Sequence, residues 1–150
     1  MKPLIVLLCV FVVAALVQNL VLHHNDLAFS GRIGMAAMLA FTGMGHFMYT
    51  KGMALMVPDF IPFKKLIIYL TGIFEFVAAI TLLIPATQLL TAWLLIVFFI
   101  IMLPANIKAA IEKVDYQKGT HDGNGMNYLW FRVPLQLLFI AWTYMSVVLI

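Results

Sequence analysis

The chain has 150 residues, of which 65% are hydrophobic and only 10% are charged, and its mean hydropathy is +1.07. That much apolar surface excludes an ordinary soluble globular protein and indicates one membrane-embedded domain. In such a protein the net charge of +3 reflects orientation in the membrane and does not indicate nucleic-acid binding. The single cysteine, Cys9, excludes an internal disulfide, a Cys-x-x-Cys redox pair and a four-cysteine metal site.

Five apolar segments are each long enough to cross a membrane as a helix, and none has the two-residue alternation of a barrel strand. In chain order they are Pro3–Leu22, Ile33–Tyr49, Leu66–Ile84, Leu89–Ala105 and Tyr128–Ile150. The first could instead be a cleaved signal peptide, because a lysine near the start precedes an apolar run. Its length and the lack of a small-x-small cleavage site favour an uncleaved helix. We therefore predict an all-α integral membrane protein with five spans.

The connections between these segments are marked by turn and capping residues. Ser30, followed by a glycine, predicts the start of the second helix, with Ser30 as its N-cap. Three residues predict that the second connection is a non-helical or re-entrant loop: Gly52, Pro58 and Pro62. Pro85 ends the third helix. The fourth connection, residues 115–125, is polar and turn-rich, but it lacks the acidic spacing and the closing glutamate of a calcium loop.

The basic residues predict which way the helices point. With five spans, the N-terminus and the second and fourth connections share one side of the membrane. That side holds Lys2, Lys51, Lys64, Lys65, Lys108, Lys113 and Lys118, with Arg132 just inside the fifth helix. The opposite side holds only Arg32. Because basic residues are retained in the cytoplasm, we predict a cytoplasmic N-terminus and a C-terminus outside.

Glu75 is the one acidic residue in the middle of an apolar segment. The other five lie in predicted water-facing connections: Asp26, Asp59, Glu112, Asp115 and Asp122. A carboxyl group at the centre of a membrane costs a few kcal/mol, so it should face protein or a wet cavity and have a partner. Small and polar residues share its helix face: Thr71, Gly72, Ala78 and Ala79. This stripe predicts close packing against a neighbouring helix.

Four further polar side chains join Glu75 at the midplane or in the cytoplasmic half of the membrane, given a rise of about 1.5 Å per residue. They are His46, Asn106, Arg132 and Gln136. The functional hypothesis is a cavity open to the cytoplasm, in which Glu75 takes up a proton or binds a polar headgroup. The alternative is a structural clamp, in which Glu75 bonds Gln136 or Arg132 and fixes the helix register. Arg132 could also extend to the lipid headgroups, as arginines near helix ends do.

No metal or haem site is predicted. A b-type haem takes two axial side chains, and His46 is the only histidine inside a predicted span. Iron–sulfur spacing, a phosphate loop and the common hydrolase motifs are also missing. The chain therefore lacks a redox centre of its own.

Five short motifs in this order resemble the DoxX-like membrane protein family. They are Gly45-His46-Phe47, Met56-Val57-Pro58, the stretch 69–75, the stretch 103–106 and the stretch 129–136, and the resemblance covers residues 33–145. It implies a small bacterial multi-pass protein, with a four-helix bundle core in residues 31–150 and an added helix in residues 1–30. The family's namesake is similar to a small subunit of a quinone-linked oxidase system, and eukaryotic relatives include a receptor-assembly chaperone. The resemblance implies that the functional positions of the family correspond here to the same five polar residues: His46, Glu75, Asn106, Arg132 and Gln136.

Three hypotheses for function follow. The first is a bacterial inner-membrane accessory subunit of a quinone-linked redox complex. It would not be catalytic on its own, and it would hold a quinone-like or lipid-like ligand in the polar pocket. Its partners would be membrane lipids and other membrane subunits or a second copy, with no nucleic acid. The second is an assembly or interaction protein whose polar network is only structural. A small proton-coupled transporter is the third, although five short helices without inverted repeats leave little room for alternating access.

Overall fold

The computed structural model describes residues 2–21, 23 and 26–149, so the predicted helix ends at Leu22 and Ile150 lie outside the described residues. In this part of the chain every regular element is a helix, and Asp115 and Thr120 form one isolated bridge. Four helical segments are long and apolar enough to cross a membrane: Lys2–Leu20, Leu27–Met48, Gln88–Ile111 and Met126–Val148. The prediction of an all-helical chain with the character of a multi-pass membrane protein is confirmed.

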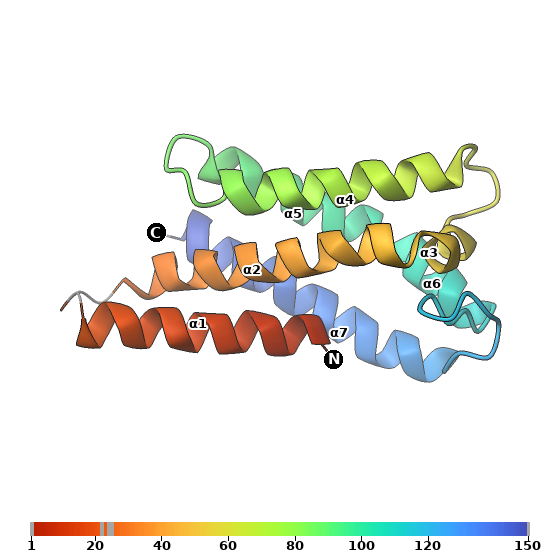
Figure 1. Ribbon diagram of the computed structural model, residues 1–150, viewed down its shortest axis with the longest axis horizontal. Helices are drawn as coiled ribbons and strands as arrows, with labels where there is room; N and C mark the ends of the chain where they lie inside the picture. Colours follow the sequence, from red (N-terminus) through yellow and green to blue (C-terminus); the bar gives the residue numbers. More distant parts are fainter. Residues whose placement is uncertain (1, 22, 24–25, 150) are drawn as a thin grey trace.

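The helices in chain order are α1 (Lys2–Leu20), α2 (Leu27–Met48), α3 (Thr50–Met56), α4 (Lys64–Thr81), α5 (Gln88–Ile101), α6 (Leu103–Ile111), α7 (Met126–Thr143) and a final π-helical turn, η1 (Tyr144–Val148). Helix α2 has α1 packed along one side and α4 along the other, and α7 runs obliquely behind it (Figure 1). The predicted third span corresponds to α4. It is not among the four apolar segments, because its 18 residues include three charged ones, Lys64, Lys65 and Glu75.

Helix α2 begins earlier than predicted. Its N-cap is Asp26, whose carboxylate accepts a hydrogen bond of 2.8 Å from the backbone N–H of Phe29. Gln18 of α1 in turn accepts a bond of 3.1 Å from the Asp26 N–H. The prediction that Ser30 is the N-cap is wrong, because Ser30 lies in the first turn of α2 and is fully buried. An acidic side chain satisfies the unpaired N–H groups of a helix start, and here it does so one turn earlier.

The second connection is partly helical, which corrects the prediction of a non-helical loop. Residues Thr50–Met56 form α3, and only the stretch around Pro58 and Pro62 is irregular. Gly52 lies inside α3. Only glycine fits at this position, because a Cβ would overlap the backbone carbonyl of Tyr116 in the fourth connection. Here glycine allows a close approach of two backbones and does not mark a turn.

The fourth predicted span continues beyond its predicted end at Ala105. The helix breaks at Met102 and resumes as α6, which extends to Ile111. Pro104 lies in the first turn of α6, where the missing N–H would have had no helical partner. The proline therefore begins a new helix instead of ending the old one.

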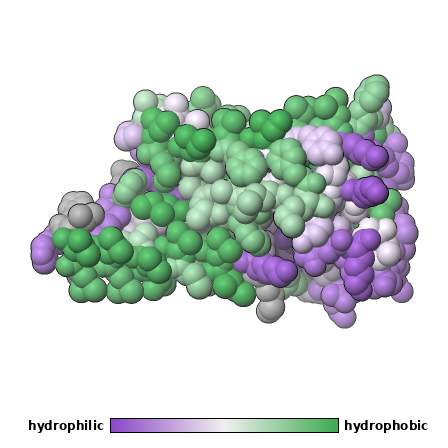
Figure 2. Space-filling view, in the orientation of Figure 1, coloured by the Kyte–Doolittle hydropathy of each residue, from purple (hydrophilic) through white to green (hydrophobic). Residues whose placement is uncertain are grey.

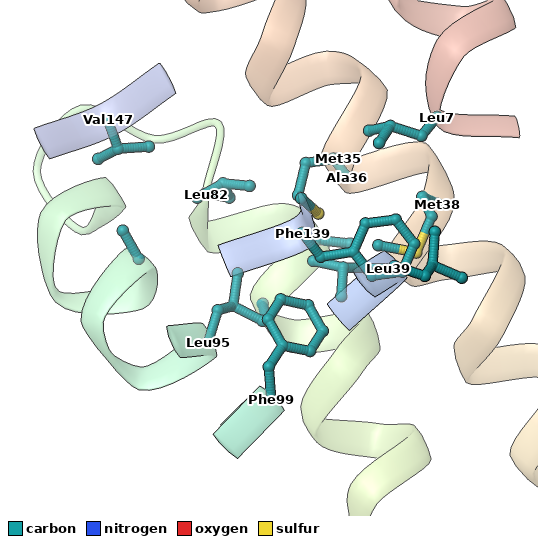
Figure 3. Close-up of a cluster of buried hydrophobic side chains, with 14 residues drawn as sticks. Leu7, Met35, Ala36, Met38, Leu39, Leu82, Leu95, Phe99, Phe139 and Val147 are labelled. Carbon is teal, nitrogen blue, oxygen red and sulfur yellow. The ribbon is translucent and has the colours of Figure 1, made fainter. Parts of the chain in front are cut away.

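The apolar core occupies the half of the bundle away from α3 and α6. Buried side chains from α1, α2, α4, α5, α7 and η1 meet there, including Leu7, Met35, Met38, Leu39, Leu95, Phe99, Phe139 and Val147 (Figure 3). On α2 the core residues precede Thr42 and His46, and on α4 Ala78 and Ala79 follow Glu75. Because these helices are antiparallel, Thr42, His46 and Glu75 all lie on the α3 and α6 side of this core.

The surface has the polarity of a membrane protein. Hydrophobic residues cover most of the length of the molecule, and hydrophilic residues gather at the end where α3 and α6 lie (Figure 2). Most lysines belong to helices or loops at this end, which we call the lysine end: Lys51, Lys64, Lys65, Lys108, Lys113 and Lys118. The start of α1, marked N in Figure 1, lies part-way along the bundle and not at this end.

Candidate functional site

Helices α2 and α4 cross closely at two glycines. A Cβ on Gly72 would lie 2.9 Å from the Cβ of His46 and 3.3 Å from the carbonyl oxygen of Gly43. A Cβ on Gly43 would lie 3.3 Å from the carbonyl oxygen of Gly72. On α4 the predicted stripe is buried at Gly72, Glu75, Ala78 and Ala79. The prediction of close packing along this face is confirmed, and the partner is α2.

This crossing brings His46 and Glu75 together. Nε2 of His46 lies 3.9 Å from Oε1 of Glu75, and Nδ1 of His46 lies 3.2 Å from the hydroxyl of Thr71. His46 is 8% exposed and Glu75 is 6% exposed, so both are shielded within the protein. A separation of 3.9 Å is longer than a hydrogen bond. The two side chains therefore face each other without a direct hydrogen bond, and a polar group beside them could bond to both.

Proton positions in this cluster are linked. The Thr71 hydroxyl carries one proton and lies near two acceptors, the carbonyl of Ile68 at 2.9 Å and Nδ1 of His46. When it donates to Ile68, Nδ1 must carry a proton and donate to Thr71, so a neutral ring presents the bare Nε2 to Glu75. When it donates to Nδ1, the proton is on Nε2 and faces Glu75. The ring can therefore present either a donor or an acceptor to Glu75.

The second carboxyl oxygen of Glu75 is the least satisfied polar atom of the site. Oε2 is buried and has no hydrogen-bond partner among the residues that the structure describes. The hydroxyl of Thr42 is within hydrogen-bonding reach of the carboxyl group, but it also contacts the carbonyls of Met38 and Leu39, both at 3.1 Å. A buried polar atom without a protein partner is a candidate contact for the polar group of a ligand.

Asn106 and Gln136 form a second cluster between α6 and α7. Nδ2 of Asn106 donates to Oε1 of Gln136 over 3.2 Å, and the hydroxyl of Tyr128 donates to Oδ1 of Asn106 over 3.2 Å. Nε2 of Gln136 donates to the backbone carbonyl of Phe99 on α5. Each amide group thus has a protein partner for both its oxygen and its nitrogen. This cluster connects three helices and leaves no oxygen of these side chains open.

Four of the five predicted residues therefore form two pairs, His46 with Glu75 and Asn106 with Gln136. Arg132 is partly exposed, lies one turn before Gln136 on α7, and interacts electrostatically with Glu75 and with Tyr128. The sequence analysis does not include Tyr128 among the polar residues, although its hydroxyl bonds to Asn106. The spacing of Tyr128 could have indicated this contact. Tyr128, Arg132 and Gln136 follow one another at intervals of four residues, so they share one face of the helix.

Two surface hollows lie elsewhere. One is lined by Ala54, Leu55, Phe63, Lys64, Lys65 and Leu66. The other is lined by Pro58, Asp59, Pro104, Ile107, Lys108, Ile111 and Glu112. Within the described residues, no three His, Cys, Asp or Glu side chains gather as metal ligands would. The polar clusters are thus interior features of the helix contacts, and an open cavity lined by all five residues is not among these hollows.

Comparison with known families gives one match. The model of the family described as a domain of unknown function, DUF8561, matches residues 35–147. The chain belongs to this family. Comparisons with curated proteins and with solved structures gave no match. The matched DUF8561 region runs from α2 to η1, so it contains both polar clusters, whereas α1 lies outside it.

Proposed function

We propose that this DUF8561 protein is a binding subunit of the bacterial inner membrane that holds the headgroup of a quinone-like or lipid-like molecule at the His46–Glu75 pair. The observation that carries the proposal is the buried Oε2 of Glu75, which has no partner among the described residues. Supporting it is the separation of 3.9 Å between His46 and Glu75. A ligand hydroxyl or carbonyl placed there would complete hydrogen bonds that the protein leaves unmade.

The proposal includes α4 as a fifth membrane span. Its 18 residues would extend about 27 Å, close to the roughly 30 Å of a hydrocarbon core. Opposite its buried stripe, α4 exposes bulky apolar side chains: Leu66, Leu70, Ile73, Val77 and Ile80. A helix with small and polar residues inward and large apolar residues outward suits a lipid environment. Glu75 would then lie about 16 Å from Lys64, near the centre of the membrane.

The chemistry of the pair suits a headgroup with oxygen atoms. An ionised Glu75 accepts a hydrogen bond from a hydroxyl, and a protonated Glu75 donates one to a carbonyl. His46 can do either, as its contact with Thr71 allows both ring tautomers. A quinone and its reduced form present these two kinds of group, and so does a lipid with free hydroxyls.

Aromatic side chains along the same helix contact provide a route from the lipid. Phe47 stacks on Tyr69 with ring centroids 5.6 Å apart and contacts Phe76 at 6.1 Å. Phe47 is 44% exposed and Tyr69 is 41% exposed, so the stack reaches the apolar surface next to His46. Flat apolar walls of this kind suit a ring that lies against the exposed face of this stack, beside His46. The lysine end would face the cytoplasm, in agreement with the distribution of basic residues.

The test is to purify the protein from its native membranes and to quantify bound quinones and lipids by mass spectrometry. We expect one ligand to be retained by the wild type and its occupancy to fall about tenfold in Glu75→Gln, since one hydrogen bond to a charged group is worth at least ~1.4 kcal/mol. Gln136→Leu is the control, because it removes a polar side chain of the other cluster. A wild type without a bound molecule, or a Glu75→Gln variant with undiminished occupancy, overturns the proposal.

A second candidate function is an assembly or interaction protein in which both clusters only hold the helices together. The closed network of Asn106, Gln136 and Tyr128 favours it, because that cluster has no group left to bind a ligand. In this case Glu75→Gln lowers thermal stability, while the variant still captures the same membrane partners as the wild type after cross-linking. Loss of ligand without loss of stability decides for the first proposal.

A further inference from the structure

The loop before α4 exposes two phenylalanines next to lysines. Phe60 is 85% exposed and Phe63 is 79% exposed, although both lie at the hydrophilic lysine end. Phe63 also has a positive φ of 53°, a conformation that bulky residues rarely adopt. Its ring gains little packing within the described protein. Exposed aromatic rings beside basic residues are typical of a segment at the membrane interface.

A surface hollow of about 580 Å³ lies between α3 and the start of α4. Its wall is mainly apolar, formed by Ala54, Leu55, Phe63 and Leu66, and Lys64 and Lys65 supply its charge. From Leu66 the exposed apolar face of α4 continues through Leu70 and Ile73. The hollow therefore joins a cationic end to an apolar track that follows the helix into the proposed membrane span.

The two lysines of the hollow are not equivalent. Nζ of Lys64 lies 2.6 Å from Oδ1 of Asp59, and Nζ of Lys108 lies 2.7 Å from the same oxygen. Lys65 is exposed and has no ion pair among the residues described in the structure. Lys65 is thus the cation of the hollow that is not already neutralised by Asp59.

We propose that this hollow binds an anionic phospholipid. The phosphate would contact Lys65, the acyl chains would follow Leu66, Leu70 and Ile73, and Phe60 and Phe63 would insert beside them. The charge of Lys65 selects an anionic headgroup over a zwitterionic one, and the apolar wall selects a lipid over a soluble phosphate. The site lies at the end of α4, about 15 Å from Glu75 along the helix, and is independent of any ligand held at the His46–Glu75 pair.

Native mass spectrometry of the full-length protein tests this proposal. The protein is equilibrated in mixed micelles with equal amounts of phosphatidylglycerol and phosphatidylcholine, and the bound lipids are counted. We expect the wild type to retain phosphatidylglycerol preferentially. Lys65→Gln should lower this preference about fivefold, the change expected for one lysine near an anionic surface. An excess of glycerol 1-phosphate, which has the headgroup chemistry without acyl chains, should not displace the lipid.

The matched control is Lys118→Gln. Lys118 is also exposed at the lysine end, but it pairs with Asp115 at 3.6 Å and with Asp122 at 3.8 Å. Both variants remove one positive charge. If the preference for phosphatidylglycerol depends only on net charge, it should therefore fall equally in the two variants. Equal losses in the two variants, an equal uptake of both lipids by the wild type, or displacement by glycerol 1-phosphate would each overturn the proposal. Ligand occupancy at Glu75, measured on the same samples, should not change in Lys65→Gln.

Discussion

The two polar clusters are buried to a similar extent, but they differ in what the protein leaves unbonded. Between α6 and α7, Asn106, Gln136 and Tyr128 satisfy one another and a backbone carbonyl. Between α2 and α4, His46 and Glu75 stand 3.9 Å apart and one carboxyl oxygen has no partner in the described chain. A complete hydrogen-bond network stabilises the bundle, whereas an incomplete one offers a position to something else. Hydrogen-bond satisfaction, more than polarity or depth, separates a structural cluster from a candidate binding site.

The largest expected effect comes from forcing α2 and α4 apart. In Gly72→Ala the new methyl group would lie 2.9 Å from the Cβ of His46 and 3.0 Å from the ring of Phe47. Because His46 is buried and its Cβ cannot move without shifting the backbone of α2, we expect a loss of about 2 kcal/mol in the free energy of unfolding, as for other overpacked positions. Unfolding by denaturant in a fixed detergent measures this loss.

The control for that substitution is Gly45→Ala on α2. The nearest atoms to a Cβ there are at 3.8 Å and 3.9 Å, in the side chains of Met53 and Tyr49, so the methyl group has room. Helix propensity alone should then leave stability unchanged or raise it by up to about 1 kcal/mol. Equal losses for the two alanine variants would contradict the close crossing at Gly72.

The next effect separates the two clusters directly. Gln136→Leu leaves the Asn106 amide and the carbonyl of Phe99 without their partner, so we expect a loss of about 1 kcal/mol in stability and no change in bound ligand. Glu75→Gln removes no hydrogen bond from Oε2, so stability should change by less than about 0.5 kcal/mol while the ligand is lost. Unfolding curves and ligand counts on the same preparations give both quantities. The reverse pattern would assign the structural role to Glu75 and the binding role to Gln136.

The smallest effect concerns the lysine end, where Asp59 connects the α3–α4 loop to α6. Hydrogen bonds and charge from Lys108 and Lys64 lower the pKa of Asp59 from 3.8 to about 2. A lowered pKa in the folded state means that the contribution of Asp59 to stability is present above pH 3.8 and is lost as the pH falls to about 2. We expect Asp59→Asn to melt slightly below the wild type at pH 6 and together with it near pH 2. Melting curves across this range provide the measurement, and a difference that persists at the acid end would contradict the role of this carboxylate.

Much of the architecture follows from simple properties of the sequence. Long apolar runs predict helices of membrane type, and the cost of a lone carboxyl group predicts that Glu75 turns inward. The rise per residue places the polar side chains on the same side of the core. It does not give their position around the bundle, because that depends on which helices are neighbours. The contact of α2 with α4 at Gly43 and Gly72, and that of α6 with α7, divide the predicted group in two.

The other errors in prediction arise from residues with more than one use. Ser30 has the chemistry of an N-cap, but Asp26 has it too and lies earlier in the chain. Gly52 suggests a loop because glycine often breaks helices. In the structure this glycine lies inside a helix, against the backbone of another segment. Local rules cannot distinguish these cases, since the deciding contacts are made by distant parts of the chain.

The close approach of Gly52 to Tyr116 has a consequence for any protein that recognises the lysine end. Here the short helix α3 contacts the loop that precedes α7. Two connections far apart in the sequence, around Gly52 and Tyr116, therefore form one preassembled platform. A partner that docks on this platform does not have to order two separate loops, and the entropy lost on association is correspondingly smaller. A side chain at position 52 would separate the two halves of the platform.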